Sequence, residues 1–199
     1  MLLENESRYA SMDEKSLIAL CIEGDMQAFE ALVLRHEKKV FAAAYRLSGS
    51  REDGEDLAQE AFIKAWRALS GYRGQASFGT WMMAILTNLW RDRLRKVQVP
   101  QESLDEEIEG EEGPIQKQFP DKQPGPEALT ESGEAYRVLG DMLQELKAEY
   151  KEALVLRDVQ GFSYEEVAAI TGNSLGTVKS RINRGRALMR DKILGYQEQ

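Results

Sequence analysis

The chain contains very few of the residues that build disulfides and metal centres. Among 199 residues there is one cysteine, Cys21, and one histidine, His36. A single cysteine cannot form an internal disulfide or a thiolate cage, and a single histidine gives little basis for a zinc site or for histidine-based catalysis. This usage is typical of a reducing compartment, and we therefore expect a cytoplasmic protein.

Long apolar runs are missing as well. No run approaches the roughly 18 residues that span a membrane, and the first residues, MLLENESR, lack the basic start and apolar centre of a signal peptide. We therefore expect no direct insertion into a membrane. The chain also shows no nucleophile–base pair, phosphate-binding loop or metal-ligand spacing, so we expect no enzymatic activity, no cofactor and no metal.

Charge is negative overall but very unevenly distributed. The formal net charge is −8, yet residues 101–135 alone hold eleven acidic and two basic side chains, which leaves the rest of the chain at +1. Basic residues gather in two places: Arg91, Arg93, Arg95 and Lys96, and then Lys179, Arg181, Arg184, Arg186, Arg190 and Lys192. Because affinity for phosphate follows the local field, these clusters are compatible with binding to nucleic acid.

The remaining pattern predicts an all-α fold with two small helical domains. Helical periodicity fills residues 12–97 and 134–199, and strand-like alternation is absent. All five prolines lie within residues 98–133, together with ten of the eleven acids of the acidic segment, and this composition cannot bury enough apolar surface to order itself. We therefore predict a loose tail over residues 1–11 and a flexible acidic linker over residues 98–133.

Turn and capping residues divide the first domain into helices. We predict one helix capped by Asp25 and ending at Leu47, a second from Arg51 to Leu69, and a third from about Phe78 to Lys96. Glycine and serine clusters separate these helices, as expected for short connections.

Residues 162–189 have the pattern of a helix-turn-helix. Ser163 and Glu166 have the spacing of a capping box, Gly172 suits a tight turn, and Ser174 can cap the second helix. The apolar side of that helix comprises Val178, Ile182, Gly185 and Met189. The side largely opposite comprises Lys179, Ser180, Asn183 and Arg184. An apolar back and a donor-rich front are what a helix needs to enter the major groove of DNA.

Three motifs together resemble the extracytoplasmic-function (ECF) sigma factors of bacterial RNA polymerase. Residues 56–66, DLAQEAFIKAW, are similar to that family's polymerase-binding helix. Residues 72–88, YRGQASFGTWMMAILTN, resemble the loop and helix that open and read the −10 promoter element, and residues 176–181, GTVKSR, resemble the reader of the −35 element. The resemblance implies a protein that binds core polymerase, directs it to promoter DNA, helps to melt that DNA, and is held by an anti-sigma factor.

The resemblance also implies which residues form each site. At the −35 duplex it places Lys179, Ser180, Arg181, Asn183, Arg184 and Arg186. At the −10 element it places Tyr72, Arg73, Gly74, Ser77, Phe78, Trp81, Asn88 and Arg91. Against the polymerase it places Asp56, Gln59, Glu60 and Phe62. Lys179 and Arg184 have the donors to address guanine, whereas the flanking arginines are suited to phosphates.

Other classes of protein remain as alternatives. A stand-alone helix-turn-helix regulator would bind duplex DNA by itself, usually as a symmetric dimer. That class gives no reason for the −10-like loop, and binding to core polymerase would separate the two readings. An enzyme is disfavoured because the only histidine and the only cysteine are isolated in the sequence.

Overall fold

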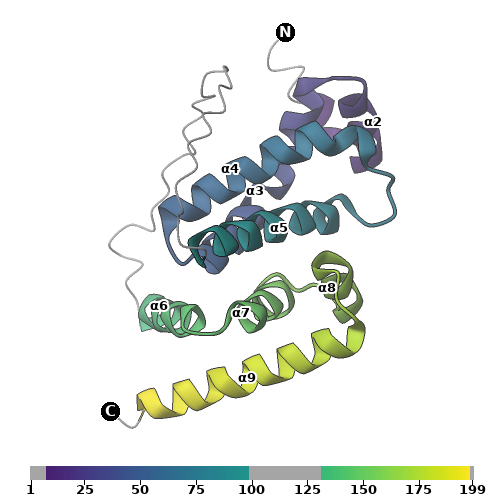
Figure 1. The fold of residues 1–199 in the computed structure, drawn as a ribbon. Coiled ribbons are helices and arrows are strands. Elements are labelled where there is room, and N and C mark those ends of the chain that lie inside the picture. The colour runs from purple at the N-terminus through teal and green to yellow at the C-terminus, as the bar shows by residue number, and fades with distance from the viewer. Residues whose placement is uncertain (1–7, 99–130, 198–199) are drawn as a thin grey trace, which may run out of the picture.

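The computed structural model of the protein describes residues 8–98 and 131–197. Within these ranges the regular elements are helical and no strand occurs, which confirms the all-α class. The elements are α2 (Glu14–Ile22), α3 (Met26–Ser48), α4 (Arg51–Ala68), η1 (Leu69–Gly71), α5 (Phe78–Gln98), α6 (Glu131–Gln144), α7 (Ala148–Leu154), η3 (Val155–Val159), α8 (Tyr164–Thr171) and α9 (Leu175–Gln197). Figure 1 shows them as two helical groups, α2–α5 and α6–α9. Most of the predicted acidic linker, residues 99–130, lies outside the described residues.

The long helices of the first group begin at the caps that the sequence predicts. The Asp25 carboxylate accepts hydrogen bonds from the backbone N–H groups of Gln27 and Ala28, at 2.9 and 3.1 Å. Ser50 Oγ accepts one from the backbone N–H of Asp53 at 3.1 Å. Such caps each contribute about 1 kcal/mol, and here they fix where α3 and α4 begin. The ends of α3, α4 and α5 lie within two residues of the predicted positions.

The core of this group is formed by one face of each helix. Its most deeply buried aliphatic side chains include Leu17, Leu32, Val40, Leu47, Leu57, Leu69, Met82 and Leu86. Burying each aliphatic side chain of this size contributes roughly 1.5–3 kcal/mol before conformational entropy is counted. The small residue Gly54 lets α4 approach α3 closely, because a Cβ there would lie 2.9 Å from the Cα of Tyr45.

The prediction of a loose tail over residues 1–11 is wrong for residues 8–11. These residues are helical, and Tyr9 is only 8% exposed. The Tyr9 hydroxyl donates to the Asp25 carboxylate at 2.8 Å, and the Arg35 guanidinium donates to the Ala10 carbonyl at 3.0 Å. Both partners lie far along the sequence, so local pattern could not reveal these contacts.

The second group packs around the helix-turn-helix. Its core includes Leu156, Val167, Ile170, Val178 and Ile182, all at most 3% exposed. Helix α7 continues into the π-helical segment η3 before the chain turns toward α8. The two helical groups also contact each other, because α5 packs on α8 while α3 packs on η3 and α6 (Figure 1). Among the described residues, no helix is both long enough and apolar enough to cross a membrane.

Candidate nucleic-acid interface

The helix-turn-helix forms with the local geometry that its sequence predicts. Ser163 Oγ accepts from the backbone N–H of Glu166 at 3.1 Å, and the Glu166 carboxylate accepts from the backbone N–H of Ser163 at 2.8 Å. Gly172 ends α8 with a φ of 66°, a left-handed conformation that glycine adopts without strain. Ser174 Oγ accepts from the backbone N–H of Thr177 at 3.1 Å and so caps α9. These bonds set the angle at which α9 leaves the turn.

Helix α9 presents a polar face to solvent. Val178 and Ile182 are buried at 1% and 0% exposure, and they orient the helix against the core. The predicted base-reading residues are all exposed: Lys179, Ser180, Asn183 and Arg184. The Ser180 hydroxyl already donates to the Thr177 carbonyl at 2.9 Å. Donors and acceptors therefore line one accessible strip of the helix.

Two arginines beside this strip are engaged with carboxylates of the same domain. Arg181 is half-buried and lies 3.2 Å from the Glu149 carboxylate. The Arg186 guanidinium donates twice to Asp158, at 3.0 and 2.5 Å, and these bonds raise the pKa of Arg186. Arg181 is thus restrained by α7 and Arg186 by η3, and the sequence pattern does not predict these ion pairs.

The loop before α5 is held above an aromatic cluster. The Tyr72 ring lies 5.1 Å from Trp81 and 6.1 Å from Phe78, measured between ring centroids. The Tyr72 hydroxyl donates to the Ala76 carbonyl at 2.7 Å, which closes the loop on itself. Burial raises the pKa of Tyr72, so this hydroxyl remains a donor at neutral pH.

The remaining residues of the predicted −10 site divide by exposure. Arg73, Gly74, Ser77 and Asn88 are exposed. Phe78 is fully buried, and its ring packs 5.0 Å from His36. Ser77 Oγ accepts from the backbone N–H of Thr80 at 3.1 Å and caps α5. The loop therefore offers a polar rim over an apolar floor, and Phe78 belongs to the floor.

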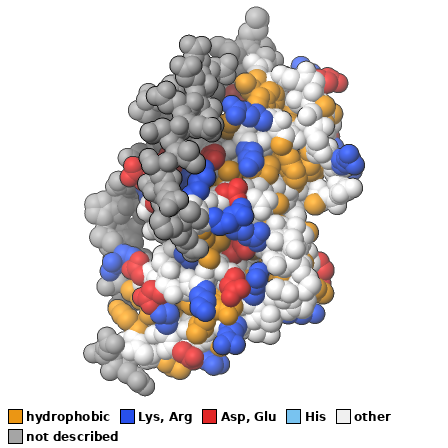
Figure 2. Space-filling view, in the orientation of Figure 1, with side chains coloured by type: hydrophobic (Ala, Val, Ile, Leu, Met, Phe, Trp, Pro, Cys, Tyr) orange, Lys and Arg blue, Asp and Glu red, His pale blue; other side chains and the backbone are white. Residues whose placement is uncertain are grey.

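The predicted polymerase face lies on α4. Asp56, Gln59 and Glu60 are exposed on that helix, whereas Phe62 is 7% exposed and packs into the core. Glu60 accepts a hydrogen bond from Arg93 of α5 at 2.7 Å. Both residues line a cavity of about 510 Å³ between α4 and the end of α5. In the space-filling view of Figure 2, basic and acidic side chains are intermixed on the visible side of the molecule and do not form one basic patch.

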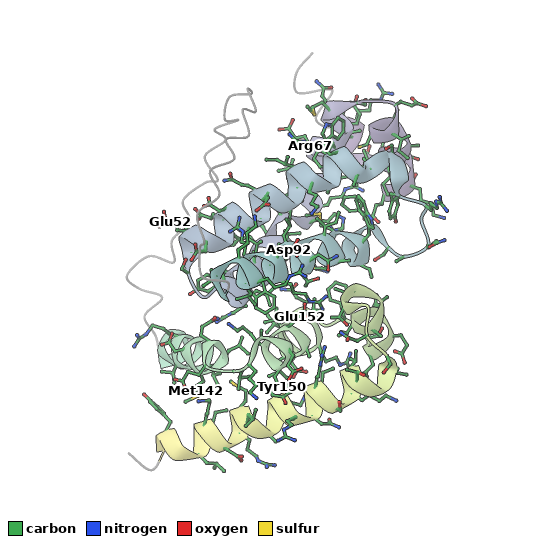
Figure 3. The ribbon with its side chains drawn as sticks, in the orientation of Figure 1. Glu52, Arg67, Asp92, Met142, Tyr150 and Glu152 are labelled. Atoms are coloured by element: carbon green, nitrogen blue, oxygen red, sulfur yellow. The ribbon has the colours of Figure 1, made fainter. Side chains whose placement is uncertain are left out.

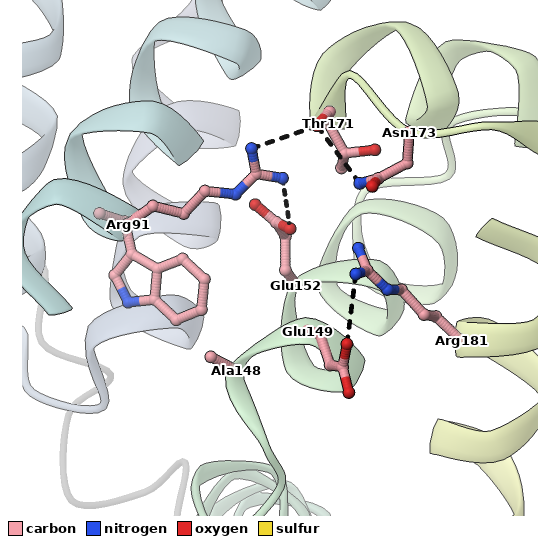
Figure 4. Close-up of a pocket in the computed structure, with 8 residues that line it drawn as sticks. Arg91, Ala148, Glu149, Glu152, Thr171, Asn173 and Arg181 are labelled. Carbon is pink, nitrogen blue, oxygen red and sulfur yellow. Dashed lines mark hydrogen bonds and ion pairs between the residues drawn. The ribbon is translucent and has the colours of Figure 1, made fainter. Parts of the chain in front are cut away.

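Arg91 lies at the contact between the two helical groups. Its guanidinium donates to the Glu152 carboxylate of α7 at 2.7 Å and to the Thr171 carbonyl of α8 at 3.2 Å. Figure 4 shows these bonds beside a cavity of about 300 Å³ that Glu149, Asn173 and Arg181 also line. Arg91 is thus the member of the predicted −10 set that the structure turns toward the second domain.

Sequence reasoning missed the residues opposite Arg91. Lys151 and Glu152 are buried at 9% and 2% exposure, although in sequence they belong to a charged stretch that reads as a solvated helix face. Figure 3 shows Glu152 extending from α7 into the space next to α5. Their burial arises when the other domain covers them, so no local signal could have identified them.

Sequence comparison matches two family descriptions to this chain. Sigma-70 region 2 matches residues 32–99, and Sigma-70, region 4 matches residues 136–189. The first match covers α4, α5 and the loop between them, and the second covers α7 to the recognition strip of α9. Each match therefore coincides with one of the two helical groups.

Curated relatives and solved structures agree with these matches. The ECF RNA polymerase sigma factor SigE of Mycolicibacterium smegmatis is 36% identical over 175 residues, which are 87% of this chain and 65% of that protein. The ECF RNA polymerase sigma-E factor of Haemophilus influenzae is 34% identical and covers 92% of this chain and 96% of its own length. The sigma factor RpoE of Bartonella quintana, solved with the anti-sigma factor NepR, has a TM-score of 0.60 and 27% identity over 83% of this chain and 96% of that chain.

The two sigma regions occur in the family's order on one chain, with identity above 30% to relatives over nearly their whole length. The chain therefore belongs to the extracytoplasmic-function sigma factors, which direct bacterial RNA polymerase to promoters and start transcription.

Proposed function

We propose that this sigma factor divides promoter recognition among three surfaces. One surface is the polar strip of α9, the second is the loop before α5 with the polar side of that helix, and the third is the acidic face of α4. The observation that carries the proposal is their coexistence on one chain, with each set of polar side chains supported by a packed apolar layer beneath it. A stand-alone regulator would have no use for the second and third surfaces.

The strip on α9 is suited to reading the −35 element as duplex DNA. Lys179 and Arg184 supply donors for guanine O6 and N7, and Asn183 can pair with adenine or contact a phosphate. Arg181 and Arg186, already oriented by Glu149 and Asp158, would steady the helix on the DNA backbone. In this division Lys179, Asn183 and Arg184 would read sequence, and the two ion-paired arginines would set the register of the helix on the DNA.

The loop before α5 is suited to holding unpaired bases of the −10 element. A base that leaves the stack loses a few kcal/mol, and aromatic walls with polar groups at their rim can offset this loss. Trp81 and Tyr72 supply aromatic surface, with Phe78 beneath them, while Arg73, Gly74, Ser77 and Asn88 supply the rim. Arg91, one turn beyond Asn88 on α5, would contact a phosphate.

The acidic face of α4 would bind core polymerase. Asp56, Gln59 and Glu60 would make the contacts, and Phe62 would hold the helix in place from inside the core. The polymerase then carries out catalysis, so this protein would perform no chemical step itself. We further propose that it acts in the cytoplasm and that an anti-sigma factor restrains it, as NepR is bound to the Bartonella protein.

Binding to core polymerase and transcription from a promoter test this proposal. The purified chain should co-elute with core polymerase, and Asp56→Lys should weaken co-elution because it reverses charge on the proposed contact face. Glu23→Lys is the matched control, since Glu23 is exposed at the end of α2 and is not part of the proposed contact face of α4. Loss of binding in both variants, or no binding by the unaltered chain, would contradict the proposed polymerase surface.

A further inference from the structure

The contact between the two domains is built around buried charges. Glu152 of α7 is 2% exposed, and one of its oxygens accepts the hydrogen bond from Arg91 of α5 at 2.7 Å. The second nitrogen of Arg91 is held by the Thr171 carbonyl at 3.2 Å. The guanidinium is therefore bonded to α7 and α8 at the same time, and both helices belong to the other domain.

A second set of bonds lies beside the first and crosses the same boundary. Lys151 Nζ donates to Gln144 Oε1 at 2.7 Å and approaches the Leu47 carbonyl at 3.4 Å. Gln144 Nε2 donates to the Arg46 carbonyl at 2.8 Å, so it binds the last turn of α3. Lys151 also lies 5.8 Å from the centre of the Trp90 ring, next to Arg91 in sequence. Lys151 and Glu152, which are adjacent residues of α7, thus contact both α3 and α5 of the other domain.

The interface is polar enough to be reversible. Within the described residues, Glu152 Oε1 is a buried oxygen with no hydrogen-bond partner. A buried carboxylate with one unsatisfied oxygen carries a desolvation cost that water removes when the surfaces part. Attraction to Arg91 favours contact, while the unsatisfied oxygen favours separation. These opposing contributions are what we expect at a contact between domains that opens and closes reversibly.

Use of Arg91 on promoter DNA requires this contact to open. While the domains are packed, one terminal nitrogen of Arg91 donates to the Glu152 carboxylate and the other to the Thr171 carbonyl. A guanidinium binds a phosphate most strongly through two parallel N–H donors. A phosphate that takes these donors must therefore displace Glu152 and Thr171, and with them the packed domain.

We propose that Arg91 and Glu152 form an intramolecular latch that holds the domains together in the free protein and keeps Arg91 away from nucleic acid. The second half of this proposal rests on the proposed function of α5, because Arg91 lies three residues after Asn88 and shares its side of the helix. Glu152 then competes with a DNA phosphate for the same guanidinium. The latch needs no other protein.

The distance between the domains in the full chain tests the latch. Fluorescent dyes are attached to cysteines introduced by Arg67→Cys in α4 and Gly195→Cys in α9, both exposed positions, with Cys21→Ala removing the native thiol. Energy transfer then reports the packed and separated populations. This measurement uses neither polymerase nor promoter, so its outcome is independent of whether the proposed function holds.

Charge reversal provides the decisive variants. Glu152→Arg sets two guanidinium groups against each other, and we expect the separated population to rise roughly tenfold or more. Adding Arg91→Glu restores an opposite pair and should bring back most of the energy transfer, which also shows that the altered domains still fold. Glu149→Gln is the matched control, because its partner Arg181 belongs to the same domain and the domain distance should not change.

The latch is wrong if Glu152→Arg leaves energy transfer unchanged, or if the double reversal is as separated as the single one. Arg91 is the more exposed partner of the pair. Arg91→Ala should separate the domains as Glu152→Arg does.

A single-stranded −10 oligonucleotide tests whether DNA competes with Glu152 for Arg91. By linkage it should separate the wild-type domains, and it should have little further effect in Glu152→Arg. If the oligonucleotide binds without changing the distance between the domains, DNA does not compete with Glu152 for Arg91.

Discussion

At the scale of single residues, ion pairing distinguishes exposed basic residues that the sequence places in one cluster. Lys179, Arg184 and Arg186 are all exposed on α9, but Arg186 is bonded twice to Asp158. All three are basic residues in one sequence cluster, and the structure assigns them different constraints. A substitution therefore has different expected effects at each position.

Arg184→Ala should reduce discrimination at the −35 element. Loss of a bidentate contact to guanine costs roughly 1–3 kcal/mol at one base position. The measurement is binding of the full chain with core polymerase to duplexes that vary at each −35 position. Arg190→Ala is the comparison, because Arg190 is an exposed arginine of the same basic cluster outside the base-reading strip, so its loss should not change discrimination between sequences. A uniform loss for Arg184→Ala would show that Arg184 contacts phosphate only.

Tyr72→Phe should weaken binding of single-stranded −10 DNA without unfolding the domain. The variant keeps the ring against Trp81 and removes the hydroxyl that closes the loop on Ala76. A neutral hydrogen bond contributes about 1 kcal/mol, or roughly a fivefold change in affinity. Tyr45→Phe, at an exposed position of α3, serves as the control. Equal affinities for wild type and Tyr72→Phe would show that the loop needs no such closure.

At the scale of elements, capping residues and periodicity predicted the fold well. The Asp25 cap, the Ser163 capping box and the Gly172 turn were all visible in the sequence, because each acts within a few residues. The packing of residues 8–11 on Arg35 was not predictable, since it depends on a partner in another helix. Lys151 and Glu152 were missed for the same reason, because their burial depends on helices of the other domain. The polar strip of α9 was predicted because its pattern lies within one helix.

Gly54→Ala should destabilise the first domain although alanine favours helices. A Cβ at Gly54 would lie 2.9 Å from the backbone of Tyr45, and backbone cannot move aside as a flexible side chain can. Overpacking typically costs about 1–3 kcal/mol, against a propensity gain of up to about 1 kcal/mol. Chemical denaturation measures the difference. Gly195→Ala, a helical site with open space around it, should be neutral or stabilising, and equal behaviour of the two variants would contradict the close α3–α4 contact.

At the scale of the whole molecule, the domain contact should depend on pH. Burial raises the pKa of the Glu152 carboxyl above its usual value of 4.5, although the hydrogen bond and charge of Arg91 oppose this. A carboxyl whose pKa is raised in the packed state favours that state when protonated. The packed state should therefore gain stability as pH falls toward 4.5 and lose it as pH rises through the raised pKa.

Energy transfer between the labelled domains, measured from neutral to mildly acidic pH, checks this dependence. Other groups at the contact also carry charge, including Arg91 and Arg181, and burial lowers the pKa of Lys151 from its usual 10.5. The response that belongs to the Glu152 carboxyl is therefore isolated by a variant that removes this carboxyl alone. Glu152→Gln cannot titrate and should give a flatter profile; an unchanged profile would assign the response to other groups.

Transcription in vitro with core polymerase and a library of templates randomised upstream of the start site tests the central claim most directly. If two separate domains choose the promoter together, the transcribed templates will be enriched in two sequence blocks at a fixed spacing. Arg184→Ala should alter only the upstream block, and substitutions in the loop at residues 72–77 only the downstream one. Absence of transcripts, or enrichment of a single block, would contradict the account.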